Sequence, residues 1–97
     1  MDITEIRRKL EEKRGYIREI FHVKEIGIFG SFTRREQSIK SDIDILVEFD
    51  KGYKDFFNYM RLKYYLEGML GKEVDIVMKG AIKPRLQERI LNEVEYV

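Results

Sequence analysis

Hydrophobic positions divide the chain into six segments of regular structure. Apolar residues recur at helical spacing over residues 3–21 and 55–70. The same spacing begins near Pro84, with apolar positions at Leu86, Ile90, Leu91 and Val94. Short apolar or alternating runs at 24–29, 42–49 and 73–78 predict three strands. The predicted order is α-β-β-α-β-α, which indicates an α+β fold (α/β two-layer): a small mixed sheet of about three strands with helices packed on it.

Capping and turn residues give boundaries to these segments. Asp2 or Thr4 can cap the first helix, and Gly71 is suited to the position that follows the second. Pro84 is suited to the first turn of the third helix. Gly52 and Gly80 indicate turns before the second helix and after the third strand. No linker or repeat interrupts this order, so we expect residues 1–97 to form a single domain.

The segment 42–49 carries the clearest alternation in the chain. One face would carry Asp42, Asp44, Leu46 and Glu48, and the other Ile43, Ile45, Val47 and Phe49. The wholly apolar set is the predicted core face. The acidic residues therefore point away from the main core, together on one side of the sheet.

Composition excludes several classes of function. The chain has 19 Lys and Arg against 18 Asp and Glu, a net charge of +1, so we expect no direct binding of long nucleic acids. Its apolar runs are too short to span a bilayer, and its charged start does not resemble a signal peptide. We therefore expect a cytoplasmic protein without a membrane partner; the sequence leaves open whether it forms a homo-oligomer.

The absence of cysteine and the single histidine restrict any metal site to oxygen ligands. Such a site favours Mg²⁺ or Mn²⁺. Asp42 and Asp44 lie roughly 6.5–7 Å apart along one strand face. Asp75 lies between the apolar residues of the third strand, so its side chain also points off the core face. If the second and third strands are neighbours, the three carboxylates can converge on one or two ions; otherwise Asp42 and Asp44 are only a charged strand end.

Gly30 and Ser31 end the first predicted strand at a junction with a short helical turn. Glycine allows close approach of the backbone, and the following N–H groups and the serine hydroxyl can donate to a phosphate. By itself the dipeptide is an ordinary turn. Upstream of the carboxylates, it predicts a site for a metal–nucleoside triphosphate complex.

These residues carry a resemblance to a known family. Gly30-Ser31, ten further residues, then Asp42-Ile43-Asp44 resembles the motif of the minimal nucleotidyltransferases (MNT) of the DNA polymerase beta superfamily. The family's third carboxylate, in a Val-Asp-Ile-Val strand, matches Asp75. Family members often read Gly-Ser-x-Ala-Arg-Gly; Arg34 keeps the basic position, whereas Arg35 stands where the last glycine would be.

The resemblance implies a role for each of these residues. Gly30 and Ser31 would bind the β- or γ-phosphate, with Arg34 beside them. Asp42, Asp44 and Asp75 would bind two Mg²⁺ ions while a hydroxyl attacks the α-phosphate of ATP and pyrophosphate leaves. Asp75 could also orient or deprotonate that hydroxyl.

The resemblance also implies a biological function. MNT proteins are typically paired with a HEPN-domain ribonuclease toxin, so the chain would be an antitoxin that transfers AMP to a tyrosine of that toxin. One alternative is an antitoxin that silences its partner by binding alone; the intact carboxylate set argues against it. Another is transfer to a small molecule such as an aminoglycoside, against which the lack of a second domain argues.

Aromatic residues gather around the second helix. One helix in a small domain cannot bury aromatics on all sides, so we expect core packing to account for about half of them. Exposed aromatic residues mark interfaces with partners. The set comprises Tyr53, Phe56, Phe57, Tyr59, Tyr64 and Tyr65.

Overall fold

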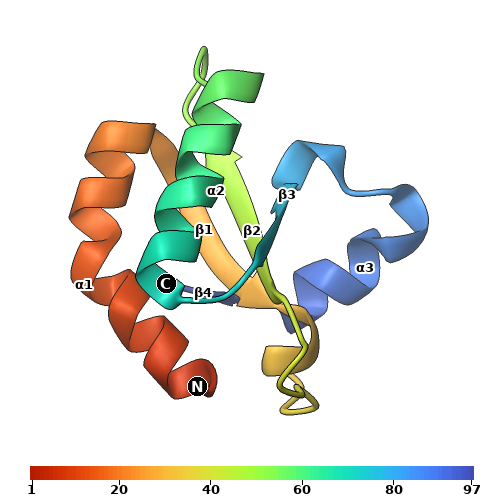
Figure 1. The fold of residues 1–97 in the computed structure, drawn as a ribbon. Helices are drawn as coiled ribbons and strands as arrows, with labels where there is room; N and C mark the ends of the chain where they lie inside the picture. Colours follow the sequence, from red (N-terminus) through yellow and green to blue (C-terminus); the bar gives the residue numbers. More distant parts are fainter.

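The computed structural model describes all residues, 1–97, as a four-stranded mixed sheet with helices on both faces (Figure 1). Its helices are α1 (Ile3–Phe21), α2 (Phe56–Leu70) and α3 (Pro84–Glu93). Its strands are β1 (Val23–Phe29), β2 (Ile43–Phe49), β3 (Val74–Met78) and β4 (Glu95–Tyr96). Short 3-10 turns, η1 (Gly30–Phe32) and η2 (Lys79–Ala81), follow β1 and β3. The predicted fold class and element order are confirmed, and β4 is a fourth strand that the sequence pattern did not predict.

The strands lie in the order β3-β2-β1-β4. β1 pairs antiparallel with β2 and β4, and β2 pairs parallel with β3. A parallel pair needs a crossover connection, which α2 supplies between β2 and β3. The predicted neighbouring arrangement of the second and third strands is therefore present.

The main core lies between the sheet and the two longer helices. Ile43, Ile45 and Val47 of β2 are completely buried there, as the alternation predicted. α1 contributes Ile6, Leu10 and Ile17, and α2 contributes Leu62 and Leu66. These side chains leave water when the helices cover the sheet, which is the main stabilising effect of this arrangement.

A second, smaller core lies on the other face of the sheet. Leu46 and Phe29 pack there against Ile82 and Ile90 of the α3 region. Leu46 belongs to the face that carries Asp44 and Glu48, and α3 is what buries it. This face is apolar at the centre of the sheet and acidic where β2 and β3 begin.

Residues at the helix ends cap or bound the helices in the structure. The Asp2 side chain accepts a hydrogen bond from a backbone N–H group in the first turn of α1, as predicted, and Asp55, for which no such role was predicted, does the same for α2. Gly71 has a φ of 70° at the end of α2, and Pro84 begins α3. No helix combines the length and the apolar character that crossing a membrane requires.

Candidate active site

The candidate site lies where β1 ends and where β2 and β3 begin. In the parallel register Asp44 stands beside Asp75, and in the antiparallel register Phe29, the residue before Gly30, stands beside Asp44. The sheet therefore brings the glycine turn and two of the three predicted carboxylates together. Asp42 lies two residues before Asp44, just outside β2, and is exposed.

Gly30 is in direct contact with the carboxylate of Asp44. Its φ is 80°, in the left-handed region that favours glycine. A Cβ atom on Gly30 would lie 2.0 Å from Oδ2 and 2.8 Å from Cγ of Asp44. Any side chain at this position would occupy the space of that carboxylate, so the glycine is required for two independent reasons.

The segment after Gly30 folds into a tight turn. Gly30 O accepts a hydrogen bond from Arg34 N (3.1 Å), and Ser31 O accepts one from Glu36 N (2.9 Å). Phe32 is buried in the main core, and the Thr33 hydroxyl donates to Ile28 O. One anchored aromatic side chain and these hydrogen bonds hold Ser31 and Arg34 at the edge of the acidic cluster.

Arg35 has a backbone conformation that favours glycine, the residue that family members often have at this position. Its φ is 59°, one of two positive values among the non-glycine residues. The turn therefore follows a left-handed path at this position with arginine in place of glycine. A side chain in this region carries an energetic penalty of about 1–2 kcal/mol.

We expect Arg35→Gly to stabilise the protein by about 0.5–1 kcal/mol, because relief of this penalty exceeds the extra entropy of glycine in the unfolded chain. In thermal unfolding this corresponds to a rise in Tm of roughly 2–6 °C. His22→Gly is a useful comparison, since His22 also has a positive φ but stacks on Tyr53 with ring centroids 3.6 Å apart. A lower Tm for Arg35→Gly would contradict the assigned strain.

Asp44 has an unfavourable environment for its negative charge. Partial burial is the main cause, and the nearby carboxylates of Asp75 and Asp42 add to it, which together raise the pKa of Asp44 to about 6. Arg34 acts in the opposite direction, and Glu93 contributes further repulsion. A carboxyl group whose pKa is raised by burial together with nearby charges is characteristic of functional sites.

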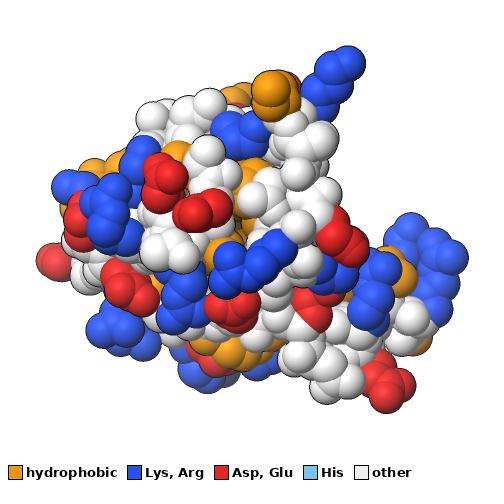
Figure 2. All heavy atoms as spheres, turned by 90° about the horizontal axis from the view of Figure 1, so that it is seen from below, with side chains coloured by type: hydrophobic (Ala, Val, Ile, Leu, Met, Phe, Trp, Pro, Cys, Tyr) orange, Lys and Arg blue, Asp and Glu red, His pale blue; other side chains and the backbone are white.

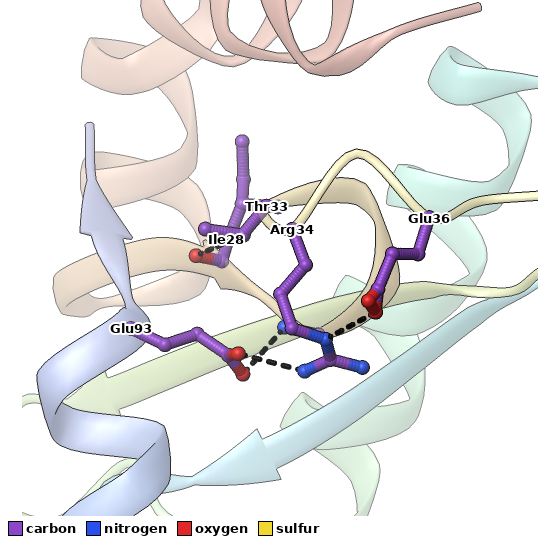
Figure 3. Close-up of polar contacts among 6 residues, drawn as sticks. Ile28, Thr33, Arg34, Glu36 and Glu93 are labelled. Carbon is purple, nitrogen blue, oxygen red and sulfur yellow. Dashed lines mark hydrogen bonds and ion pairs between the residues drawn. The ribbon is translucent and has the colours of Figure 1, made fainter.

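Glu93, at the end of α3, is a site residue that the sequence reasoning missed. Its carboxylate accepts hydrogen bonds from the Gly30 N–H (3.0 Å) and from Nη1 of Arg34 (2.7 Å), as Figure 3 shows. The alternating Val-Glu-Tyr-Val at 94–97 was the available signal for the strand that brings it there. Two residues are too short a strand for that pattern to be decisive.

The site is an open surface. None of the three cavities of the molecule is lined by Asp42, Asp44 or Asp75. The largest, about 420 Å³, lies at the opposite ends of β2 and β3. Figure 2 views the molecule from below the orientation of Figure 1, and on that face acidic and basic side chains are interspersed. No three Asp, Glu, His or Cys side chains are arranged as a ready metal-binding group.

Comparison with known proteins places the chain in a family. The model of the nucleotidyltransferase domain family matches residues 3–97. A candidate protein adenylyltransferase of Methanocaldococcus jannaschii is 50% identical, over 96% of this chain and 95% of that protein. The protein adenylyltransferase MntA of Thermococcus cleftensis is 40% identical, over 100% of this chain and 97% of its own length.

Solved structures that are similar to this chain include proteins of the same family. The structure of a candidate minimal nucleotidyltransferase superposes with a TM-score of 0.82 at 36% identity, covering 98% of this chain and 95% of that one. A tri-AMPylated HEPN toxin in complex with its MNT antitoxin, from Shewanella oneidensis, matches in fold with a TM-score of 0.67 at 21% identity, over 94% and 70% of the two chains. This chain belongs to the nucleotidyltransferase family and is an enzyme of the minimal (MNT) type within it.

Proposed function

We propose that this enzyme transfers AMP from ATP to a hydroxyl group, that the acceptor is a tyrosine of a HEPN-domain ribonuclease toxin, and that the transfer makes it an antitoxin. The observation that carries the proposal is the pairing of Asp44 with Asp75 in register, directly beside the Gly30 turn. A phosphate-binding turn beside a pair of carboxylates on neighbouring strands is what nucleotidyl transfer requires.

In this proposal the chain's own residues bind and orient the reactants. The N–H and hydroxyl of Ser31, which follow the Gly30 turn, bind the β- or γ-phosphate, and the Arg34 guanidinium donates to a phosphate oxygen. The acceptor oxygen forms a bond to the α-phosphorus while the bond to the pyrophosphate oxygen breaks. The hydroxyl proton passes to the carboxylate of Asp75, which is exposed at the start of β3 and would also orient that hydroxyl.

The donor atoms near Gly30 fit Mg²⁺. Asp42, Asp44 and Asp75 offer only carboxylate oxygens, which hard divalent cations prefer. Burial, and then the nearby carboxylates of Asp75 and Asp42, raise the pKa of Asp44, and a bound cation would favour its charged form. We propose that these three residues hold the ion or ions. When bound, Mg²⁺ would neutralise charge on the phosphates and favour departure of pyrophosphate.

Two features support a protein acceptor. The acidic site lies on an open surface, which a tyrosine that protrudes from a partner can reach. Phe56 and Phe57, at the start of α2, are 69% and 77% exposed, whereas Tyr59 and Tyr65 of the same helix pack against the core. Exposed neighbouring aromatic side chains are typical of protein interfaces.

The test is incubation of the enzyme with labelled ATP, Mg²⁺ and the HEPN protein encoded beside it. With the wild-type enzyme we expect label on a tyrosine of that protein. With Asp44→Asn we expect no label. Asp50→Asn, an exposed aspartate at the other end of β2, is the matched control and should retain activity. Tight inhibition of the ribonuclease without label, unchanged by Asp44→Asn, would instead show an antitoxin that acts by binding alone.

A further inference from the structure

The carboxylate of Glu93 joins two parts of the proposed phosphate site. It accepts the Gly30 N–H through Oε2 and the Arg34 guanidinium through Oε1 (Figure 3). The side chain of Glu93 is only 14% exposed, whereas that of Glu36, the other acidic partner of Arg34, is 59% exposed. A charge-assisted hydrogen bond is strongest where water is excluded, so Glu93 is the partner that holds Arg34.

Glu93 ends α3 just before β4, so the pairing of β4 with β1 sets its position. In the antiparallel register Gly27 lies opposite Tyr96 and Ile28 opposite Glu95. Continuing that register by two residues brings Gly30 opposite Glu93. The approach depends on Gly27, because a Cβ there would lie 2.7 Å from Cγ2 of Val94 and 3.0 Å from Glu95 O.

Two carboxylates bind the guanidinium of Arg34 but leave one of its nitrogens without a partner. Its Nη1 donates to Glu93 and its Nε to Glu36, at 2.7 Å and 3.1 Å, and Nη2 has no partner. The guanidinium is a rigid planar fork of five N–H groups. Fixing two of its nitrogens therefore fixes the direction in which the third points.

We propose that Glu93 is a positioning residue of the nucleotide site: it holds the Gly30 amide and the Arg34 guanidinium so that the free N–H groups of the arginine meet a phosphate of ATP. The inference rests on the proposed function for the Gly30 turn and Arg34. It adds that β4, outside the nucleotidyltransferase motif, sets the affinity for the nucleotide. Without Glu93 the arginine would have to be ordered by the ligand itself, which weakens binding.

The test compares Mg²⁺–ATP binding and AMP transfer for the wild type and Glu93→Gln, which keeps the size of the side chain and removes its charge. We expect the KM for ATP to rise about 5- to 10-fold and kcat to change less than about 3-fold, the signature of lost ligand positioning. Glu12→Gln, which removes an exposed carboxylate paired with Arg8 on α1, is the control and should change KM less than about 2-fold. Gly27→Ala should raise KM in the same direction as Glu93→Gln, because it displaces β4.

A double-mutant cycle shows whether Glu93 acts through Arg34. In an Arg34→Ala background, Glu93→Gln should change the Kd for ATP by less than about 2-fold, because the arginine is gone and the amide oxygen of glutamine can still accept the Gly30 N–H. A Tm that falls with an unchanged Kd would overturn the inference in favour of a structural role. Tighter ATP binding by Glu93→Gln would also overturn it, since the carboxylate would then compete with the phosphate for the same donors.

The controls separate this inference from the proposed function. Wild-type enzyme that binds ATP, with weaker binding by Arg34→Ala, supports the proposed nucleotide site. An unaltered Kd in Glu93→Gln then overturns the role of Glu93 alone. Wild-type enzyme that binds no ATP in the presence of Mg²⁺ overturns the proposed function and this inference with it.

Discussion

Gly30→Ala is expected to reduce nucleotidyl transfer at least 100-fold, because misplacement of a reacting group by about 1 Å has effects of that size. The new Cβ would lie 2.0 Å from Oδ2 of Asp44, and even the Cβ of Asp44 is only 3.1 Å away. Asp44 has a short side chain on an inner strand, so it has little freedom to move aside. Either the carboxylate or the phosphate-binding turn must leave its position.

The same substitution should also lower stability by about 1–2 kcal/mol, because alanine is strained at a φ of 80°. The measurements are AMP transfer from labelled ATP and urea unfolding of the same preparations. Gly15→Ala is the matched control: it lies inside α1, and nothing is within 4 Å of its added Cβ. That control should be as active as the wild type and about 0.5–1 kcal/mol more stable. Wild-type activity in Gly30→Ala would exclude the proposed turn as the phosphate site.

Asp44→Asn is expected to abolish transfer while it stabilises the metal-free protein at pH 8. The pKa of Asp44 is raised from 3.8 to about 6 by burial and by the carboxylates of Asp75 and Asp42. The folded state therefore binds the Asp44 proton more tightly than the unfolded state. Stability associated with this group is greatest below about pH 4 and falls as the pH rises through about 6.

Asparagine carries no charge, so the variant avoids that loss. Two pKa units correspond to nearly 3 kcal/mol, and the partial exposure of Asp44 reduces the expected gain to about 1–1.5 kcal/mol at pH 8. The difference should disappear near pH 4. Urea unfolding at both pH values, without divalent cations, measures it, and Asp50→Asn is again the control. A variant less stable than the wild type at pH 8 would contradict this account of Asp44.

Addition of Mg²⁺ provides a second measurement on the same pair of proteins. A ligand that binds only the folded state raises its stability by an amount that grows with the ratio of ligand concentration to Kd. We therefore expect Mg²⁺ to raise the Tm of the wild type and to have little effect on Asp44→Asn. An equal rise in both proteins would exclude Asp44 as a ligand of the ion.

These two predictions describe one compromise in the molecule. The acidic cluster that would bind a cation destabilises the protein when no cation is present, because like charges lie close together on a half-buried surface. Arg34 offsets part of this repulsion, and Glu93 adds to it while binding Arg34. The charges that would bind the cation therefore lower the stability of the protein in the absence of that cation.

The sequence by itself determined the local elements and most of the candidate site. Asp2, Gly71 and Pro84 act on their own helix ends, so their effect can be predicted without knowing the fold. Alternation along 42–49 assigned the buried face of β2 correctly, because a strand places successive side chains on opposite faces. The Gly-Ser and Asp-x-Asp spacing indicated which polar residues belong together, although their roles remain predictions.

Only the tertiary structure decided which distant residues meet. β4 has two residues and exists because the edge of β1 offers hydrogen-bond partners, so no local pattern could specify it. Its register, made possible by the missing side chain of Gly27, brings Glu93 to Gly30 and Arg34. Likewise the contact between Gly30 and Asp44 arises from pairing of β1 with β2. Sequence pattern encodes what each residue prefers locally, whereas contacts across the sheet depend on register and close approach that appear only when the chain is folded.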